Sequence, residues 1–121
     1  MKFTEEHHWL RPEDDEDDVV TVGMTERGVA ELGDLIFAEL PEEGTTVAAE
    51  DSVMVIEGED ETAEIMAPLD GEIVEVNEGL EDDPGLINED PMGSGWLFRM
   101  RVENMDDYAA LLDEAAYKRL L

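Results

Sequence analysis

Hydrophobic and polar residues alternate along the middle of the chain, and this alternation predicts a series of short strands. The strand-like segments are VVTVGM (19–24), LIFAEL (35–40), TTVAAEDSVMVI (45–56), TAEIMAPL (62–69), GEIVEVN (71–77) and GWLFRMRV (95–102). The Asp70-Gly71 pair predicts a tight hairpin between two of them, since glycine accepts a positive φ at little cost. Short strands punctuated by turns, with helices at the edges, favour a small β-sandwich or barrel.

Helical signals flank these strands. In TERGVAELG, Thr25 can cap a helix and Gly33 can end it, which predicts a short helix near 25–32. The tail from residue 104 has apolar residues at helical spacing, and Asp113 can cap a second, shorter helix within it. We therefore expect C-terminal helices near 105–120. The segment LEDDPGLINEDPMGSG (80–95) is interpreted as a structured loop.

Length and composition narrow the class of protein. With 121 residues the chain is expected to form a single domain, 1–121. It has no cysteine, which excludes disulfides, thiolate metal sites and cysteine nucleophiles. No apolar run approaches the ~20 residues of a membrane span, and MKFTEEHHWL does not resemble a signal peptide. A cytoplasmic location is the expectation.

The charge is strongly negative. Asp and Glu number 35 against 7 Lys and Arg, for a formal net charge of −28. Nucleic acid and anionic membranes are therefore poor partners, because binding phosphates requires cationic groups. The acidic surface either binds cations or a basic partner, or is adapted to molar salt, where self-repulsion is screened. Because the acids are spread along the chain and lysine is scarce, we favour adaptation to salt and a halophilic source.

The stretch VMVIEGEDETAEIMAP, Val53 to Pro68, has the pattern of a hairpin that presents its tip to a partner. Two apolar runs flank EGEDET, which offers carboxylates and one hydroxyl but no amine, thiol or imidazole. A calcium loop is one alternative, because oxygen ligands are plentiful, but the spacing does not match an EF-hand. We predict no metal site.

No catalytic set emerges elsewhere. His7 and His8 are the only imidazoles, and a metal site would need further ligands, so one packed and one solvated histidine is the simpler interpretation. Ser52 and Ser94 do not lie in a nucleophile-elbow pattern. No catalytic residue is predicted, and the residues alone favour a carrier or an interaction module.

Several ordered motifs resemble the H protein of the glycine cleavage system. FTEEHHWL is similar to that family's opening segment, and VTVGMTERGVAELGDLIFAELPEEGTTV follows its Leu-Gly-Asp and Glu-Leu-Pro pattern. APLDGEIVEVNEGLEDDPGLINEDPMGSGWL resembles the segment after the family's modified hairpin, with the Asn-Glu-Asp-Pro and Gly-Trp-Leu pieces. The match runs nearly end to end.

The resemblance implies a lipoyl/biotinyl-type barrel-sandwich hybrid, mainly β, and a non-catalytic role. Family members carry lipoate on a lysine within Glu-Ser-Val-Lys-Ala and pass an aminomethyl group from the P protein to the T protein, after which the L protein reoxidises the arm. Counting from Pro41 and from Pro68 places Asp60 where that lysine stands. Its neighbours are Glu57, Gly58, Glu59 and Glu61, and no lysine lies between Lys2 and Lys118. We therefore predict no lipoate and no other cofactor at this tip.

Three hypotheses follow. The first is a lipoyl-less relative that acts as a protein-interaction module or regulator, binding the P, T or L proteins or a lipoate-handling enzyme. The second is a genuine H protein that carries the aminomethyl group to the T protein. The third is a cation-binding or structural acidic domain whose working surface is EGEDET. The oligomeric state does not follow from the sequence.

Overall fold

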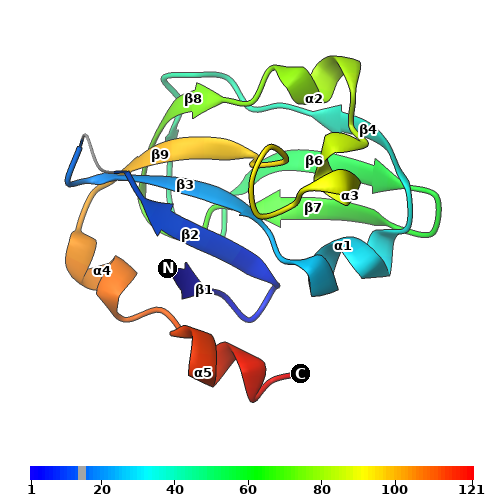
Figure 1. The fold of residues 1–121 in the computed structure, drawn as a ribbon. Coiled ribbons are helices and arrows are strands. Elements are labelled where there is room, and N and C mark those ends of the chain that lie inside the picture. Colours follow the sequence, from blue (N-terminus) through cyan, green and yellow to red (C-terminus); the bar gives the residue numbers. More distant parts are fainter. Residues whose placement is uncertain (14–15) are drawn as a thin grey trace.

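The computed structural model describes residues 1–13 and 16–121, and two antiparallel sheets dominate it (Figure 1). The larger sheet has six strands in the order β1–β2–β3–β9–β8–β5, and the smaller has three in the order β4–β6–β7. The strands are β1 Lys2–Phe3, β2 His8–Pro12, β3 Val19–Met24, β4 Leu35–Glu39, β5 Thr46–Val47, β6 Ser52–Gly58, β7 Thr62–Met66, β8 Gly71–Val76 and β9 Phe98–Val102. The mainly β expectation is confirmed.

The described residues form five short helices at the edges of the sheets: α1 Glu26–Leu32, α2 Gly79–Asp82, α3 Leu86–Glu89, α4 Met105–Ala109 and α5 Glu114–Lys118. The predicted caps are present, since the side chains of Thr25 and Asp113 accept bonds from backbone N–H groups of α1 and α5. Gly33 ends α1 with φ 75°. The 80–95 segment is a structured loop, as expected, and contains α3 and most of α2.

The inward faces of both sheets share one hydrophobic core. Alternating strand residues such as Val20, Val22, Ile56, Ile73 and Met100 are fully buried in it. A second cluster forms where α5 meets the N-terminal strands: the ring of Tyr117 stacks on Phe3, with centroids 4.8 Å apart. The chain ends therefore lie together, on the side away from the β6–β7 turn (Figure 1).

Two sequence predictions about this architecture are wrong. Asp70-Gly71 does not form a hairpin, because β7 pairs with β6 and β8 pairs with β5 and β9. At this point the chain crosses from one sheet to the other. Gly71 has no positive φ; it is small because a Cβ there would collide with the carbonyl oxygen of Arg101. The segment 45–56 is not one strand either, since a turn with Glu50 at φ 75° divides it into β5 and β6.

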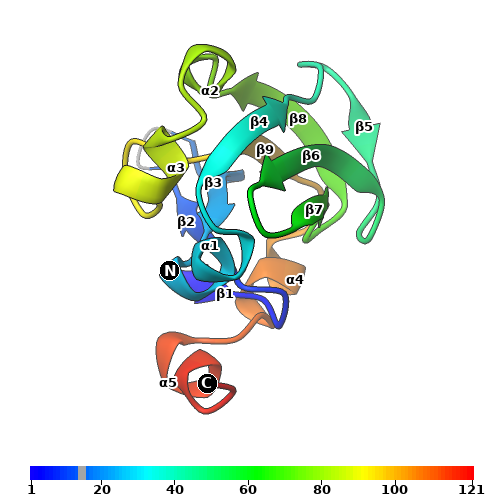
Figure 2. The ribbon, with the colours of Figure 1, turned by 90° about the vertical axis from the view of Figure 1, so that its right-hand side faces the viewer.

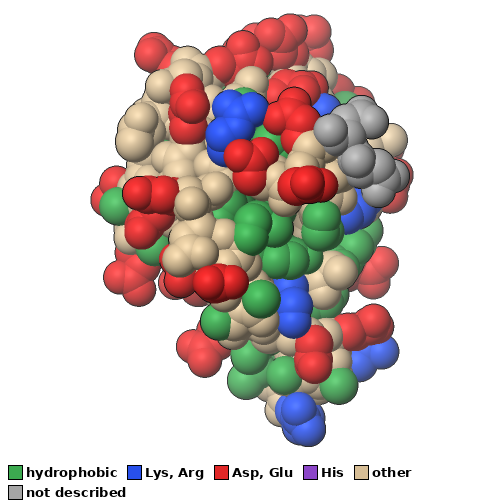
Figure 3. All heavy atoms as spheres, turned by 90° about the vertical axis from the view of Figure 1, so that its left-hand side faces the viewer, with side chains coloured by type: hydrophobic (Ala, Val, Ile, Leu, Met, Phe, Trp, Pro, Cys, Tyr) green, Lys and Arg blue, Asp and Glu red, His purple; other side chains and the backbone are tan. Residues whose placement is uncertain are grey.

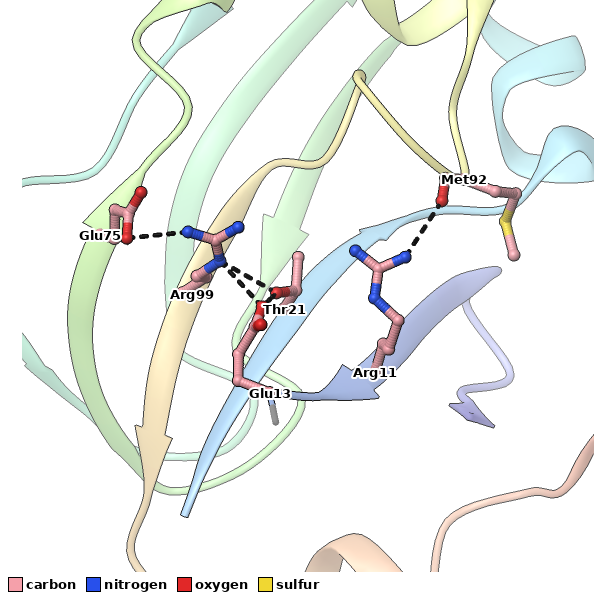
Figure 4. Close-up of polar contacts among 6 residues, drawn as sticks. All are labelled: Arg11, Glu13, Thr21, Glu75, Met92 and Arg99. Carbon is pink, nitrogen blue, oxygen red and sulfur yellow. Dashed lines mark hydrogen bonds and ion pairs between the residues drawn. The ribbon is translucent and has the colours of Figure 1, made fainter. Parts of the chain in front are cut away.

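Ion pairs organise the outer face of the larger sheet. The Arg99 guanidinium contacts Glu13, Thr21 and Glu75 and lies 4.4 Å above the Trp96 ring (Figure 4). Figure 3 shows the molecule from the side opposite the β6–β7 turn, where acidic side chains cluster around the uppermost basic ones and hydrophobic side chains lie below them. In the acidic segment 12–18, Pro12 ends β2, Glu13 and Glu16 pair with arginines, and positions 14–15 lie outside the described residues.

Candidate functional site at the β6–β7 turn

The VMVI and AEIM runs form an antiparallel hairpin, as predicted. Glu57 of β6 pairs with Thr62 of β7, and the Gly58 N–H donates to the Glu61 carbonyl at 2.9 Å. The turn is therefore narrower than EGEDET and has Glu59 and Asp60 at its apex. Both apex side chains are exposed.

Backbone hydrogen bonds fasten this turn to the end of α1. The Asp60 N–H donates to the Leu32 carbonyl at 3.0 Å, and the Glu59 N–H donates to the Asp34 carbonyl at 2.9 Å. The last carbonyls of a helix lack partners within it, so the turn satisfies one of them. The turn and α1 lie side by side in Figure 2.

Two glycines allow this close approach. A Cβ at Gly58 would overlap the Leu32 carbonyl oxygen, and a Cβ at Gly33 would lie 2.6 Å from the Asp60 Oδ2. Real Cβ contacts are longer, so a side chain at Gly58 would push the turn away from α1, whereas one at Gly33 would displace the exposed Asp60 carboxylate. The sequence predicts that Gly33 ends the helix, but it does not predict that Gly33 also contacts the β6–β7 turn.

A groove of about 250 Å³ runs beside the turn, between α1 and β7. Its walls include Met24, Leu32, Ile65 and the buried His8. Burial, with a smaller contribution from His7, lowers the pKa of His8 to about 4, so its imidazole is neutral near pH 7. The carboxylates of Glu6, Glu31, Glu61 and Glu64 also line the groove.

The remaining candidate residues do not assemble into a reactive centre. His8 is the packed histidine of the pair; His7 is half-buried, and its Nδ1 lies 2.8 Å from the Tyr117 hydroxyl. Ser52 begins β6 and Ser94 lies in the loop before β9, and neither hydroxyl bonds a histidine within residues 1–13 and 16–121. The described part of the chain has no group of three or more His, Asp or Glu placed to hold a metal. It also has no helix long and apolar enough to cross a membrane.

Comparison with known proteins gives the family. The model of the glycine cleavage H-protein family matches residues 1–121. The chain belongs to this family. It is 46% identical over 118 residues to the glycine cleavage system H protein of Psychrobacter sp. (strain PRwf-1), covering 98% of this chain and 92% of the relative. It is also 46% identical over 121 residues to that of Cronobacter sakazakii, with 100% and 92% covered.

The fold agrees with a solved structure of the family. The crystal structure of a glycine cleavage system H protein from Mycobacterium marinum superimposes with a TM-score of 0.85 at 36% identity, covering 98% of this chain and 93% of that one. The barrel-sandwich hybrid expected from the resemblance is confirmed. As a member of the H-protein family the chain is a component of a multienzyme system, not a catalyst in its own right.

The residues at the turn do not fit lipoate in the linkage that the family uses. An amide bond to lipoate needs a nucleophilic amine, and the position matching the lysine carries the carboxylate of Asp60. Lys2 lies in β1 and Lys118 in α5, so neither lysine belongs to the β6–β7 turn (Figure 1).

Proposed function

We propose that this protein serves the glycine cleavage system as a docking component that carries no lipoate at residue 60. Asp60 is the observation that carries the proposal, since it places a carboxylate where the family has an amine. The family's scaffold is kept along the whole chain, and what differs is the chemistry of one turn. Such a protein would bind P, T or L proteins, or a lipoate-handling enzyme, and compete with a lysine-bearing H protein.

The geometry of the turn supports this role. The hydrogen bonds from Glu59 and Asp60 to the α1 end hold the turn in place. A surface held in one conformation loses little entropy when a partner binds, which favours docking. The exposed carboxylates of Glu57, Glu59 and Asp60 give it a negative field that selects basic partners.

A genuine aminomethyl carrier is the second candidate, and the full-length similarity supports it directly. The relatives named above are all called H proteins, and the chain covers more than nine tenths of each. For this protein to act as such a carrier, the lipoyl arm would have to be held other than by an amide at residue 60. The cation-binding hypothesis has less support, because no ligand cluster exists among the residues described.

Reconstitution separates the two candidates. The unmodified protein is supplied as the sole H component to purified P, T and L proteins, and glycine decarboxylation is measured. We expect no turnover. We also expect the protein to inhibit the same reaction when a lipoylated, lysine-bearing H protein supports it. Turnover with the unmodified protein contradicts the proposal, and absence of inhibition contradicts the competition.

We further propose that the acidic surface is an adaptation to salt and that the protein works in a salt-rich cytoplasm. The net charge of −28 repels itself in dilute buffer, and at about 1 M salt the screening length falls to roughly 3 Å. Thermal unfolding midpoints should therefore rise steadily with KCl. A midpoint independent of KCl would contradict this interpretation.

A further inference from the structure

A β-bulge in β4 puts two large apolar side chains on the surface side by side. Register shifts between Leu35 and Phe37, so that Leu35 pairs with Gly58 and Phe37 with Glu57. Simple alternation from the buried Leu35 would turn Phe37 inward. The extra residue moves it outward instead, and Ile36 is 58% exposed and Phe37 50% exposed. Elsewhere in the described chain, the exposed large hydrophobic residues are Met1, Leu120 and Leu121, near the chain ends.

These two residues belong to a broader face with a definite chemistry. The register of the three-stranded sheet gives two rows of outward positions. One row is Phe37, Glu57 and Thr62, and the other is Glu39, Val55 and Glu64. All six are exposed or partly exposed. We call this set, together with Ile36, the outer sheet face. It has an apolar centre of Ile36, Phe37 and Val55 between three carboxylates.

The outer sheet face is continuous with the turn that bears Asp60. Glu57 is followed by Gly58 and the exposed Glu59 and Asp60, and no Lys or Arg occurs between Arg27 and Arg99. No positive charge in this stretch offsets the carboxylates. Within the outer sheet face and the turn, every charged side chain is therefore a carboxylate.

We propose that the outer sheet face is a docking surface for a protein that offers an apolar recess framed by lysine and arginine side chains. The inference rests on the proposed docking function and names its surface. Charge complementarity indicates which kind of partner binds this surface. A second copy of this chain would bring the same carboxylates against themselves, and nucleic acid or an anionic membrane would be repelled. The recess takes up Phe37 and Ile36, and the basic rim pairs with Glu39, Glu57 and Glu64.

The two parts of this surface have separable effects. A large aromatic at the centre of an interface commonly carries much of the affinity, because it is fully desolvated there. Charges at the rim act mainly on the association rate and on the salt dependence. Removing Phe37 should therefore raise the dissociation rate, while reversing the rim charges should lower the association rate at low salt.

Binding of the full-length, unmodified protein to purified P, T and L proteins provides the test. Dissociation constants are measured by biolayer interferometry at about 0.3 M and about 2 M KCl, because screening weakens the rim contribution. The first variant is Ile36→Ser/Phe37→Ser. Its matched control is Leu120→Ser/Leu121→Ser, which removes two equally exposed apolar side chains at α5. A second variant, Glu39→Lys/Glu57→Lys, leaves the apolar pair intact.

We expect at least one of the three proteins to bind the wild type. The Ile36→Ser/Phe37→Ser variant should bind that partner at least about tenfold more weakly at both salt concentrations. The control should change less than about twofold. The charge-reversed variant should be weakened at the lower salt concentration and recover part of its affinity at the higher one.

The failures are distinguishable. If the wild type binds a partner and both variants bind it equally well, the partner uses another surface, and this inference is wrong while the proposed function stands. If the wild type binds none of the three, docking to the glycine cleavage proteins fails, and the inference fails with it. Unfolding midpoints equal to that of the wild type show that the variants are folded.

Discussion

The carboxylate of Asp60 lies against the Cα of Gly33, close enough that a Cβ at Gly33 would come within 2.6 Å of Oδ2. Asp60, which we propose to stand in place of the family's lysine, thus lies beside the glycine that ends α1. Residues 33 and 60 therefore constrain each other, although they are far apart in the sequence.

Substitution of Gly33 tests it. Gly33→Ala should lower the free energy of unfolding by about 1 to 2 kcal/mol, because it strains a positive φ and displaces the Asp60 carboxylate. Gly44 also has a positive φ of 86° but has open space around its Cα, so Gly44→Ala should cost only about 1 kcal/mol. Urea denaturation measures both. In the Gly33→Ala background, Asp60→Ala should recover part of the loss; simple additivity of the two would contradict the contact.

Substitution can restore the family's lipoylation motif at residues 59 and 60 without disturbing the fold, but not at residue 58. Asp60→Lys with Glu59→Val, keeping Gly58, should give a folded protein that a lipoate ligase modifies, detected by intact mass. The complete Glu-Ser-Val-Lys motif would also require Gly58→Ser, whose Cβ would meet the Leu32 carbonyl oxygen. That single change should cost about 2 kcal/mol or more of stability.

A control for that change exists in an exposed helix. Gly79→Ser brings its Cβ no closer than 3.3 Å to the Asn77 Oδ1, so it should cost less than about 1 kcal/mol. Equal stability of the Gly58→Ser and Gly79→Ser proteins would show that the turn is not held against α1 as described. A folded Glu59→Val/Asp60→Lys protein that the ligase ignores would show that the recognition surface differs as well.

Much of this geometry follows from local patterns in the sequence. The β6–β7 hairpin is readable because its apolar runs flank a polar turn, and the helices α1 and α5 are readable because Thr25 and Asp113 cap them. Contacts between segments that are distant in the sequence cannot be predicted from local patterns. The residues next to Gly58 in the sequence do not distinguish it from a turn glycine, although it faces Leu32. Gly23 likewise resembles a turn glycine, although it lies within β3 against the Trp9 ring.

The candidate site shows the same division. Counting along the chain gives the position of Asp60, because the surrounding motifs keep their spacing. The bulge that exposes Phe37 depends on how β4 registers with β6, and LIFAEL alone reads as an ordinary strand. Register is set by the partner strand, so sequence periodicity cannot supply it.

The buried histidine makes stability depend on pH. The pKa of His8 is lowered to about 4 in the fold from 6.5, so the unfolded chain binds a proton more readily in this interval. The free energy of unfolding should therefore fall as pH drops from 6.5 towards 4, by up to about 3 kcal/mol from this group. Carboxylates titrate in part of the same range, so the comparison is between the wild type and His8→Gln.

The difference between those two proteins isolates the imidazole. His8→Gln should lose less stability than the wild type over this pH interval, and the NMR titration of the His8 ring should have its midpoint near pH 4. Parallel pH profiles, together with a ring titration near 6.5, would mean that His8 is open to solvent.

The Arg99 cluster should contribute measurably to stability. Arg99 joins β9 to Glu13, to Thr21 of β3 and to Glu75 of β8, with its guanidinium over Trp96 (Figure 4). Arg99→Met should lower the free energy of unfolding by about 1 to 2 kcal/mol, since Thr21 is buried and Glu13 is partly buried. Arg27→Met breaks a single 3.9 Å contact between exposed side chains of Arg27 and Glu31, and should cost less than about 0.5 kcal/mol. Equal losses in urea denaturation would contradict the cluster's role.

The most direct test of the central claim is the intact mass of the protein purified from its own host, followed by peptide mapping of residues 53–68. The account predicts the unmodified mass, with the peptide containing Asp60 carrying no adduct. A lipoyl-sized increment mapped to this turn would contradict it and restore the aminomethyl-carrier function.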